Sequence, residues 1–191
     1  EIRIFRLENV PIGSGVVLPD YIQKSKSIIG LTHHKTNGYA YEDNLCLFRC
    51  LALHFNKSLR GLEGESKRLR RQAECYTGKS FELGVDLNML AEIEICFDIC
   101  INVYSLQEDK TAAVIKISNL DHKDILHLNM YENHFSYITK FKSFAKKFKC
   151  VNCDCLLMQK YHVKRHMKIC STEITEVYCG GKYRNKKNIF V

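Results

Sequence analysis

The chain has 191 residues, 46% hydrophobic side chains and a formal net charge of +8. These values suit one domain of ordinary size with a small appendage, and they exclude an intrinsically disordered chain. No run approaches the roughly 18 apolar residues of a membrane-spanning helix, and the first residues lack a signal-peptide layout. Ten cysteines without a secretory signal indicate a reducing compartment rather than a disulfide framework. We therefore predict an intracellular protein, of cytoplasm or nucleus, with no membrane partner.

The positive charge is concentrated near the C-terminus. Residues 140–191 hold 13 Lys/Arg and 3 Asp/Glu, whereas residues 1–139 hold 16 and 18. Such a segment suits nucleic acid or another acidic partner, and a simple solvated basic surface is the alternative.

Residues 1–19 hold both prolines and form an N-terminal extension. A first helix is expected after Pro19, with Asp20 as its cap and an apolar face running from Ile22 to Ile29. The spacing of apolar residues predicts further helices over 46–55, 64–76 and 85–97.

Residues rich in β-branched side chains follow these helices. They predict strands over 99–104, 113–117 and 125–131, and a hairpin in which a short polar link, 132–134, leads into 135–139. The body, 20–142, is therefore an α+β unit with helices first and sheet later. A Lys/Phe alternation after residue 140 marks the junction with a second unit, 143–191.

Cys46 and His134 are the candidate catalytic pair. A thiol at a helix N-terminus feels the positive end of the helix dipole, which lowers its pKa and favours the reactive thiolate. The amides of the preceding loop can stabilise an oxyanion. A histidine at a hairpin turn can act as the proton shuttle. On residue chemistry alone, a packing cysteine and an ordinary turn histidine explain the same pattern.

The sequence around these residues resembles a known family. Asp43-Asn-Leu-Cys-Leu-Phe-Arg is similar to the Asp-Gly-Asn-Cys-Leu-Phe-Arg signature of the ovarian-tumour (OTU) cysteine deubiquitinases, and Asn133-His-Phe-Ser-Tyr to their histidine segment. The resemblance covers about 20–140. It implies an OTU-like, papain-type cysteine protease fold, with helices packed on a small central sheet. It also implies ubiquitin or ubiquitin chains as the partner.

The resemblance assigns roles to further residues. Asp43 matches the family aspartate three positions before the cysteine and is expected to shape the loop beside the oxyanion hole. Asn44 replaces a glycine, and we expect it to adopt the same positive φ. Ser136 stands where the family has the Asp or Asn that orients the histidine, so either Ser136 does this or an acid from elsewhere does.

The whole chain is also similar to the segment found beside the DNA polymerase of Maverick/Polinton-type DNA transposons, where an OTU-like motif precedes a zinc finger. Two other functions stay open: an OTU-like docking or nucleic-acid-binding module of a transposon polymerase with weak activity, and a cysteine protease that processes a polyprotein.

Four residues near the C-terminus have metal-ligand spacing. The pattern Cys150-x2-Cys153-x12-His166-x3-Cys170 supplies a tight knuckle and two ligands one helical turn apart. These residues predict one structural Zn²⁺ ion in a small ββα finger, with the second strand near Leu156 and Leu157 and the helix over 159–169. Cys155 and His162 are substitute ligands that we rank lower.

Overall fold

The computed structural model describes residues 16–34, 38–150, 152–153, 155–157, 160–170, 175–178 and 181–184. The helices are α1 (Asp20–Gln23), α2 (Cys46–Asn56), α3 (Leu62–Thr77), α4 (Leu90–Phe97) and α5 (Lys160–Cys170), with 3-10 turns η1 (Leu87–Met89) and η2 (Phe141–Ser143). The strands are β1 (Ile28–Ile29), β2 (Cys100–Leu106), β3 (Thr111–Lys116), β4 (Ile125–Tyr131), β5 (His134–Ile138), β6 (Lys147–Cys150), β7 (Leu156–Leu157), β8 (Thr175–Tyr178) and β9 (Gly181–Arg184).

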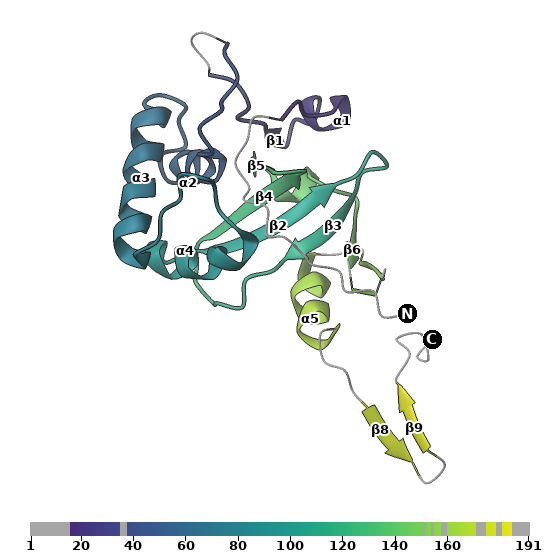
Figure 1. Cartoon of the computed structure of the whole chain (residues 1–191). Helices are drawn as coiled ribbons and strands as arrows, with labels where there is room; N and C mark the ends of the chain where they lie inside the picture. Colours follow the sequence, from purple (N-terminus) through teal and green to yellow (C-terminus); the bar gives the residue numbers. More distant parts are fainter. Residues whose placement is uncertain are drawn as a thin grey trace, which may run out of the picture.

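The fold is α+β around one mixed sheet. Its seven strands lie in the order β1-β5-β4-β2-β3-β6-β7. The pairs β2–β4 and β3–β6 are parallel, and the other neighbours are antiparallel. Figure 1 shows α2, α3 and α4 gathered at one side of this sheet, with α5 beside β6 and the β8–β9 hairpin apart from the rest. The expected α+β class is confirmed.

Helix α2 is the central element. Every residue from Cys46 to Leu53 is buried, because α2 packs against α3 on one side and against β4 and β5 on the other. A helix covered on two sides needs an almost continuous apolar surface, which explains why its sequence lacks a polar face. The helices predicted over 46–55 and 64–76 are confirmed within two residues at each end.

The chain start differs from prediction. The first helix ends at Gln23 and its N-cap is Pro19, so the expected Asp20 cap is wrong. Ile28 and Ile29 do not continue that helix. They form β1, which pairs with β5 in the register Ile29↔Tyr137. The backbone hydrogen bonds of the sheet edge therefore outweigh the helical spacing of the apolar residues.

Two other boundaries are shifted. The helix expected over 85–97 begins only at Leu90, after the 3-10 turn that Asp86 caps by accepting a hydrogen bond from the amide of Asn88 at 2.8 Å. The polar link of the hairpin is shorter than expected, since His134 already belongs to β5, where it pairs with Tyr131.

A second cluster of buried side chains lies around β2, β3 and β6. Tyr104 meets the rings of Phe141, Phe144 and Phe148 there, at centroid distances of 5.0 to 6.0 Å. Val163 of α5 belongs to the same cluster. Strands β6 and β7 and helix α5 all lie in the predicted second unit, 143–191. They share the sheet and this core with the predicted body.

Parts of the predicted segments lie outside the described residues. They include 1–15 of the N-terminal extension and, within the basic segment 140–191, residues 151, 154, 158–159, 171–174, 179–180 and 185–191. Across the described part of the chain, no helix combines the length and the apolar composition needed to cross a bilayer.

Candidate functional site

The seam between α2 and β5 brings Cys46 and His134 into one region. Cys46 is the first residue of α2, and His134 is the first residue of β5. Helix α2 packs against β5, in which Phe135 follows His134. One turn along α2, the Cys50 thiol donates to the carbonyl of Phe135 at 3.7 Å. The strand that carries His134 therefore packs along the helix that carries Cys46.

The loop before Cys46 contains a left-handed residue. Asn44 has a φ of 56°, so the expected positive φ at this position is confirmed. Its side-chain amide donates to the carbonyl of Glu82 at 3.1 Å, which ties the loop to the segment before α4. The Leu45 amide donates to Asp43 Oδ1 at 3.3 Å. Asp43 therefore contacts the loop that leads into α2.

Asp43 also belongs to an ion-pair network around Arg49, which is buried in α2 with 1% of its side chain exposed. Arg49 Nη2 lies 2.5 Å from Asp43 Oδ2, and the guanidinium donates two bonds to Glu63, at 2.9 and 2.8 Å. It also stacks 3.3 Å from the ring centroid of Tyr41. Planar, bidentate and stacked contacts of this kind suit arginine and not lysine.

The network fixes the charge state of its acids. Burial alone would raise the pKa of Asp43 and of Glu63, but hydrogen bonds and charge from Arg49 hold both pKa values below the usual ones. Burial also raises the pKa of the Tyr41 hydroxyl to about 12. Around neutral pH the two carboxylates therefore stay ionised against a buried cation, and α3 is locked to the start of α2.

The Cys46 thiol itself is closed off from solvent, with 1% exposure. Burial raises its pKa to about 11, against weaker lowering effects from the amides of Phe135 and Leu47. The expected lowering of this pKa by the helix N-terminus is therefore wrong for the free protein. The desolvation of the thiolate by burial destabilises it more than the dipole at the helix N-terminus stabilises it.

We predict that Cys46 reacts slowly with iodoacetamide in the native free protein. Exposed Cys75 is the internal control and should be modified first. Because the pKa of the Cys46 thiol is raised, its alkylation rate should increase with pH well beyond neutrality. Peptide mapping by mass spectrometry measures both rates, and alkylation of Cys46 as fast as Cys75 at pH 7 would contradict the closed geometry.

His134 and Ser136 converge on one backbone carbonyl. His134 Nε2 lies 2.7 Å from the oxygen of Gly30, and the Ser136 hydroxyl donates to the same oxygen at 3.4 Å. Both side chains are buried. Asp43, the other predicted member of the site, is held by Arg49 and the Leu45 amide.

The four predicted metal ligands come together. The ligand atoms of Cys150, Cys153, His166 and Cys170 all lie within 4.8 Å of one another. The sulfurs of Cys150 and Cys170 are 3.6 Å apart, and Cys153 Sγ lies 3.2 Å from His166 Nε2. A tetrahedral ion with bonds of about 2.0–2.3 Å holds its ligand atoms about 3.3–3.8 Å apart. The Cys150–Cys170 pair lies in this range and the Cys153–His166 pair just below it, so small side-chain shifts let this group hold a metal ion.

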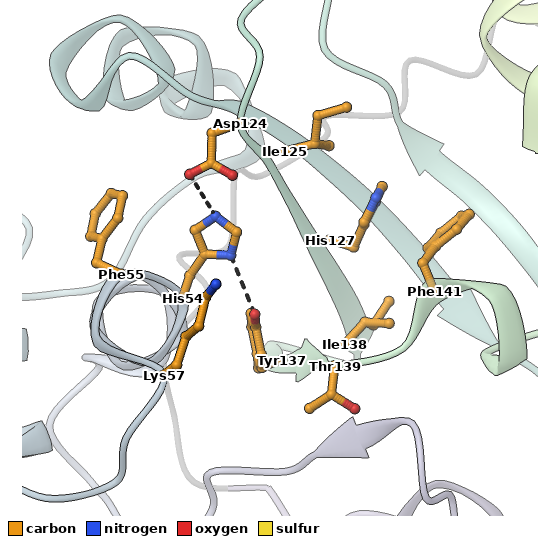
Figure 2. Close-up of a pocket in the computed structure, with 10 residues that line it drawn as sticks. All are labelled: His54, Phe55, Lys57, Asp124, Ile125, His127, Tyr137, Ile138, Thr139 and Phe141. Carbon is orange, nitrogen blue, oxygen red and sulfur yellow. Dashed lines mark hydrogen bonds and ion pairs between the residues drawn. The ribbon is translucent and has the colours of Figure 1, made fainter.

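The sequence prediction missed a second polar arrangement further along α2. His54 Nε2 lies 3.0 Å from Asp124 Oδ2, and His54 Nδ1 lies 3.3 Å from the Tyr137 hydroxyl. Figure 2 shows the imidazole between the carboxylate and the phenol, at the edge of a cavity of about 490 Å³. Cys46, Cys50 and His54 follow at four-residue spacing, so this face of α2 was readable from sequence. Its partners, Asp124 just before β4 and Tyr137 on β5, were not.

No family model, curated protein or solved structure matched this chain. The functional argument therefore rests on the arrangement of its own residues.

A further cavity, of about 760 Å³, opens between the segment 29–41 and the start of α3. Neither cavity is lined by Cys46 or His134.

Proposed function

We propose that the chain is a cysteine isopeptidase of the OTU-like kind that cleaves ubiquitin or ubiquitin chains. The observation that carries the proposal is the α2–β5 seam, where the helix that begins with Cys46 packs against the strand that begins with His134. A thiol at a helix start, a histidine on an adjacent strand and a loop with a left-handed residue before the thiol form a coherent set for acyl transfer. The OTU-like, papain-type fold is part of the same proposal.

The mechanism uses these residues in sequence. The Cys46 thiol gives its proton to the His134 ring as the sulfur attacks the C-terminal carbonyl carbon of ubiquitin, and the carbonyl electrons move to oxygen. Backbone amides at the start of α2 stabilise that oxyanion. His134 then protonates the leaving lysine amine, the C–N bond breaks, and a thioester remains on Cys46.

A water molecule completes the cycle. His134 takes a proton from the water, whose oxygen attacks the thioester carbonyl, and the C–S bond breaks to regenerate Cys46 and a free ubiquitin carboxylate. Because the free thiol is buried and its pKa raised, substrate binding must open the loop around Asn44 before the attack. Asp43 and Arg49 set the resting shape of that loop.

A panel of diubiquitins of defined linkage tests this function. We expect cleavage of at least one linkage by the wild-type chain, and a loss of about 10³-fold or more in kcat/KM on changing Cys46→Ala or His134→Ala. Cys75→Ala is the matched control on an exposed thiol and should cleave normally. Folded protein that leaves every linkage intact would contradict the proposal, and cleavage of only the chain's own flanking sequences would favour a polyprotein protease.

We further propose that the metal held by the Cys150 group is Zn²⁺ and that α5, β6 and β7 form a small ββα finger. Three thiolates and one imidazole are a donor set that zinc prefers, and four protein ligands leave no open position for catalysis. When bound, the ion supplies a structural cross-link between β6 and α5.

A docking module with weak activity is the second candidate, and two observations favour it. The thiol of Cys46 is sealed, and exposed lysines alternate with buried residues along β6 at Lys147 and Lys149. A basic strand beside the exposed Arg165 of α5 suits an acidic partner such as nucleic acid. Salt-dependent DNA binding together with an unreactive Cys46 would select this function over the first.

A further inference from the structure

The backbone carbonyl of Gly30 contacts the imidazole of His134, a contact that the sequence did not predict. Gly30 directly follows β1, and the register Ile29↔Tyr137 places this short strand along β5. Because of that pairing, the Gly30 oxygen lies 2.7 Å from His134 Nε2 and 3.4 Å from the Ser136 hydroxyl. His134 is 2% exposed and Ser136 is fully buried, so water does not compete for these bonds.

The chemistry of these atoms determines where the proton of the imidazole lies. A carbonyl oxygen only accepts hydrogen bonds, so a contact of 2.7 Å requires the proton on Nε2. A neutral imidazole carries one N–H, and its other nitrogen then carries the lone pair. His134 is therefore held as the Nε2–H tautomer, with Nδ1 as the basic nitrogen.

Ser136 cannot orient the ring from this position. Its hydroxyl hydrogen is directed to the oxygen that His134 already uses. The Ser136 hydroxyl therefore helps to hold the Gly30 carbonyl in place and makes no bond to the imidazole ring. The group in position to orient the ring is instead the main-chain carbonyl of Gly30, just after β1.

We propose that the backbone carbonyl of Gly30 is the group that positions His134 and sets its tautomer, and that Ser136 supports this carbonyl rather than acting on the ring. This rests on the proposed function, in which His134 is the base for Cys46. A carbonyl carries no formal charge, so it stabilises the imidazolium through a charge-assisted hydrogen bond that is weaker than a carboxylate ion pair. It also cannot be protonated, so it adds no acidic ionisation to the pH profile of the enzyme.

Space for a side chain at position 30 is limited. A Cβ added at Gly30 would lie 2.7 Å from Cδ1 of the buried Leu18. A side chain here must push the end of the Leu18 side chain aside or move the backbone at Gly30, and with the backbone the carbonyl that His134 contacts. Gly64, where an added Cβ meets nothing within 4 Å, has no such constraint.

Nitrogen-15 NMR of the imidazole side chains in the full, metal-loaded chain tests the tautomer without any substrate. The chain has eight histidines, and the signal of His134 is identified by its loss in His134→Ala. We expect a protonated Nε2 and an unprotonated Nδ1 in the wild type and unchanged in Ser136→Ala. An Nδ1–H tautomer in the wild type would overturn the inference, whether or not the protein cleaves ubiquitin.

The rate of Cys46 acylation by a ubiquitin thioester is the second readout. Ser136→Ala should stay within about threefold of wild type, because the carbonyl still holds the ring. A wrong histidine tautomer in a triad lowers kcat by about 10⁴-fold. A loss of 100-fold or more in Ser136→Ala, at an unchanged melting temperature, would assign the positioning role to Ser136 and overturn the inference.

Discussion

Replacing Arg49 with methionine is expected to lower the free energy of unfolding by about 2–3 kcal/mol. Removing one partner of a fully buried ion pair costs about 3–5 kcal/mol. The loss here is smaller because Asp43 and Glu63 keep 40% and 28% of their side chains exposed, so water can hydrate the carboxylates left behind. The stability of Arg49→Lys should lie between those of wild type and Arg49→Met, because lysine keeps the charge but loses the bidentate and stacked contacts. Urea denaturation measures all three proteins.

Arg68 supplies the matched control for this prediction. It pairs with Glu65 on the surface of α3, with 59% of its side chain exposed, and Arg68→Met should change stability by less than about 0.5 kcal/mol. An Arg49→Met variant as stable as Arg68→Met would contradict the role of the network. The pKa values of Asp43 and Glu63 are lowered in the folded chain, so the stability they contribute is present above pH 4–5 and is lost as the pH falls. The difference in free energy of unfolding between wild type and Arg49→Met should therefore become smaller as the pH falls below about 4.

Removing the metal is expected to destabilise the central sheet as well as the metal-binding segment. Cys150 is fully buried and pairs with Val114 of β3, so one ligand of the cluster is itself a sheet residue. A metal present at 1,000 times its Kd stabilises the folded state by about 4 kcal/mol. For a chain of this size that corresponds to a fall of about 8–16 °C in Tm on chelation. Calorimetry with and without a zinc chelator measures the shift, and slower amide exchange in β3 with metal would show that the sheet shares in it.

Two cysteine variants separate the ligands from their neighbours. Cys150→Ser should reproduce the chelated state, with lower Tm and loss of bound metal. Cys155 lies outside the ligand cluster and is exposed, so Cys155→Ser should bind metal and melt as the wild type does. A chelator that leaves the Tm unchanged would contradict a structural role for the ion.

The elements that sequence predicted well are those with a local signal. Helix α2 could be placed because its apolar residues are continuous, and the metal ligands because knuckle and helix spacings are set by short-range geometry. The positive φ of Asn44 was expected from the resemblance, because a glycine stands at this position in the family signature.

The rest depends on contacts between distant segments. Strand β1 is too short to be predicted, and it exists because the edge of β5 offers it hydrogen bonds. The raised pKa of Cys46 arises from burial by the whole fold, which outweighs the local effect of the helix start. The partners of Arg49 and His54 lie on other elements for the same reason, and no periodicity in α2 could identify them.

Reaction with ubiquitin that carries a C-terminal alkyne electrophile tests the central claim most directly. Under reducing conditions, the metal-loaded chain should gain one ubiquitin, attached to Cys46 as mapped by mass spectrometry. The adduct should be absent in Cys46→Ala and retained in Cys75→Ala. A folded, metal-loaded chain that forms no adduct, or forms it at another cysteine, would contradict the assignment of Cys46 as the nucleophile of a ubiquitin isopeptidase.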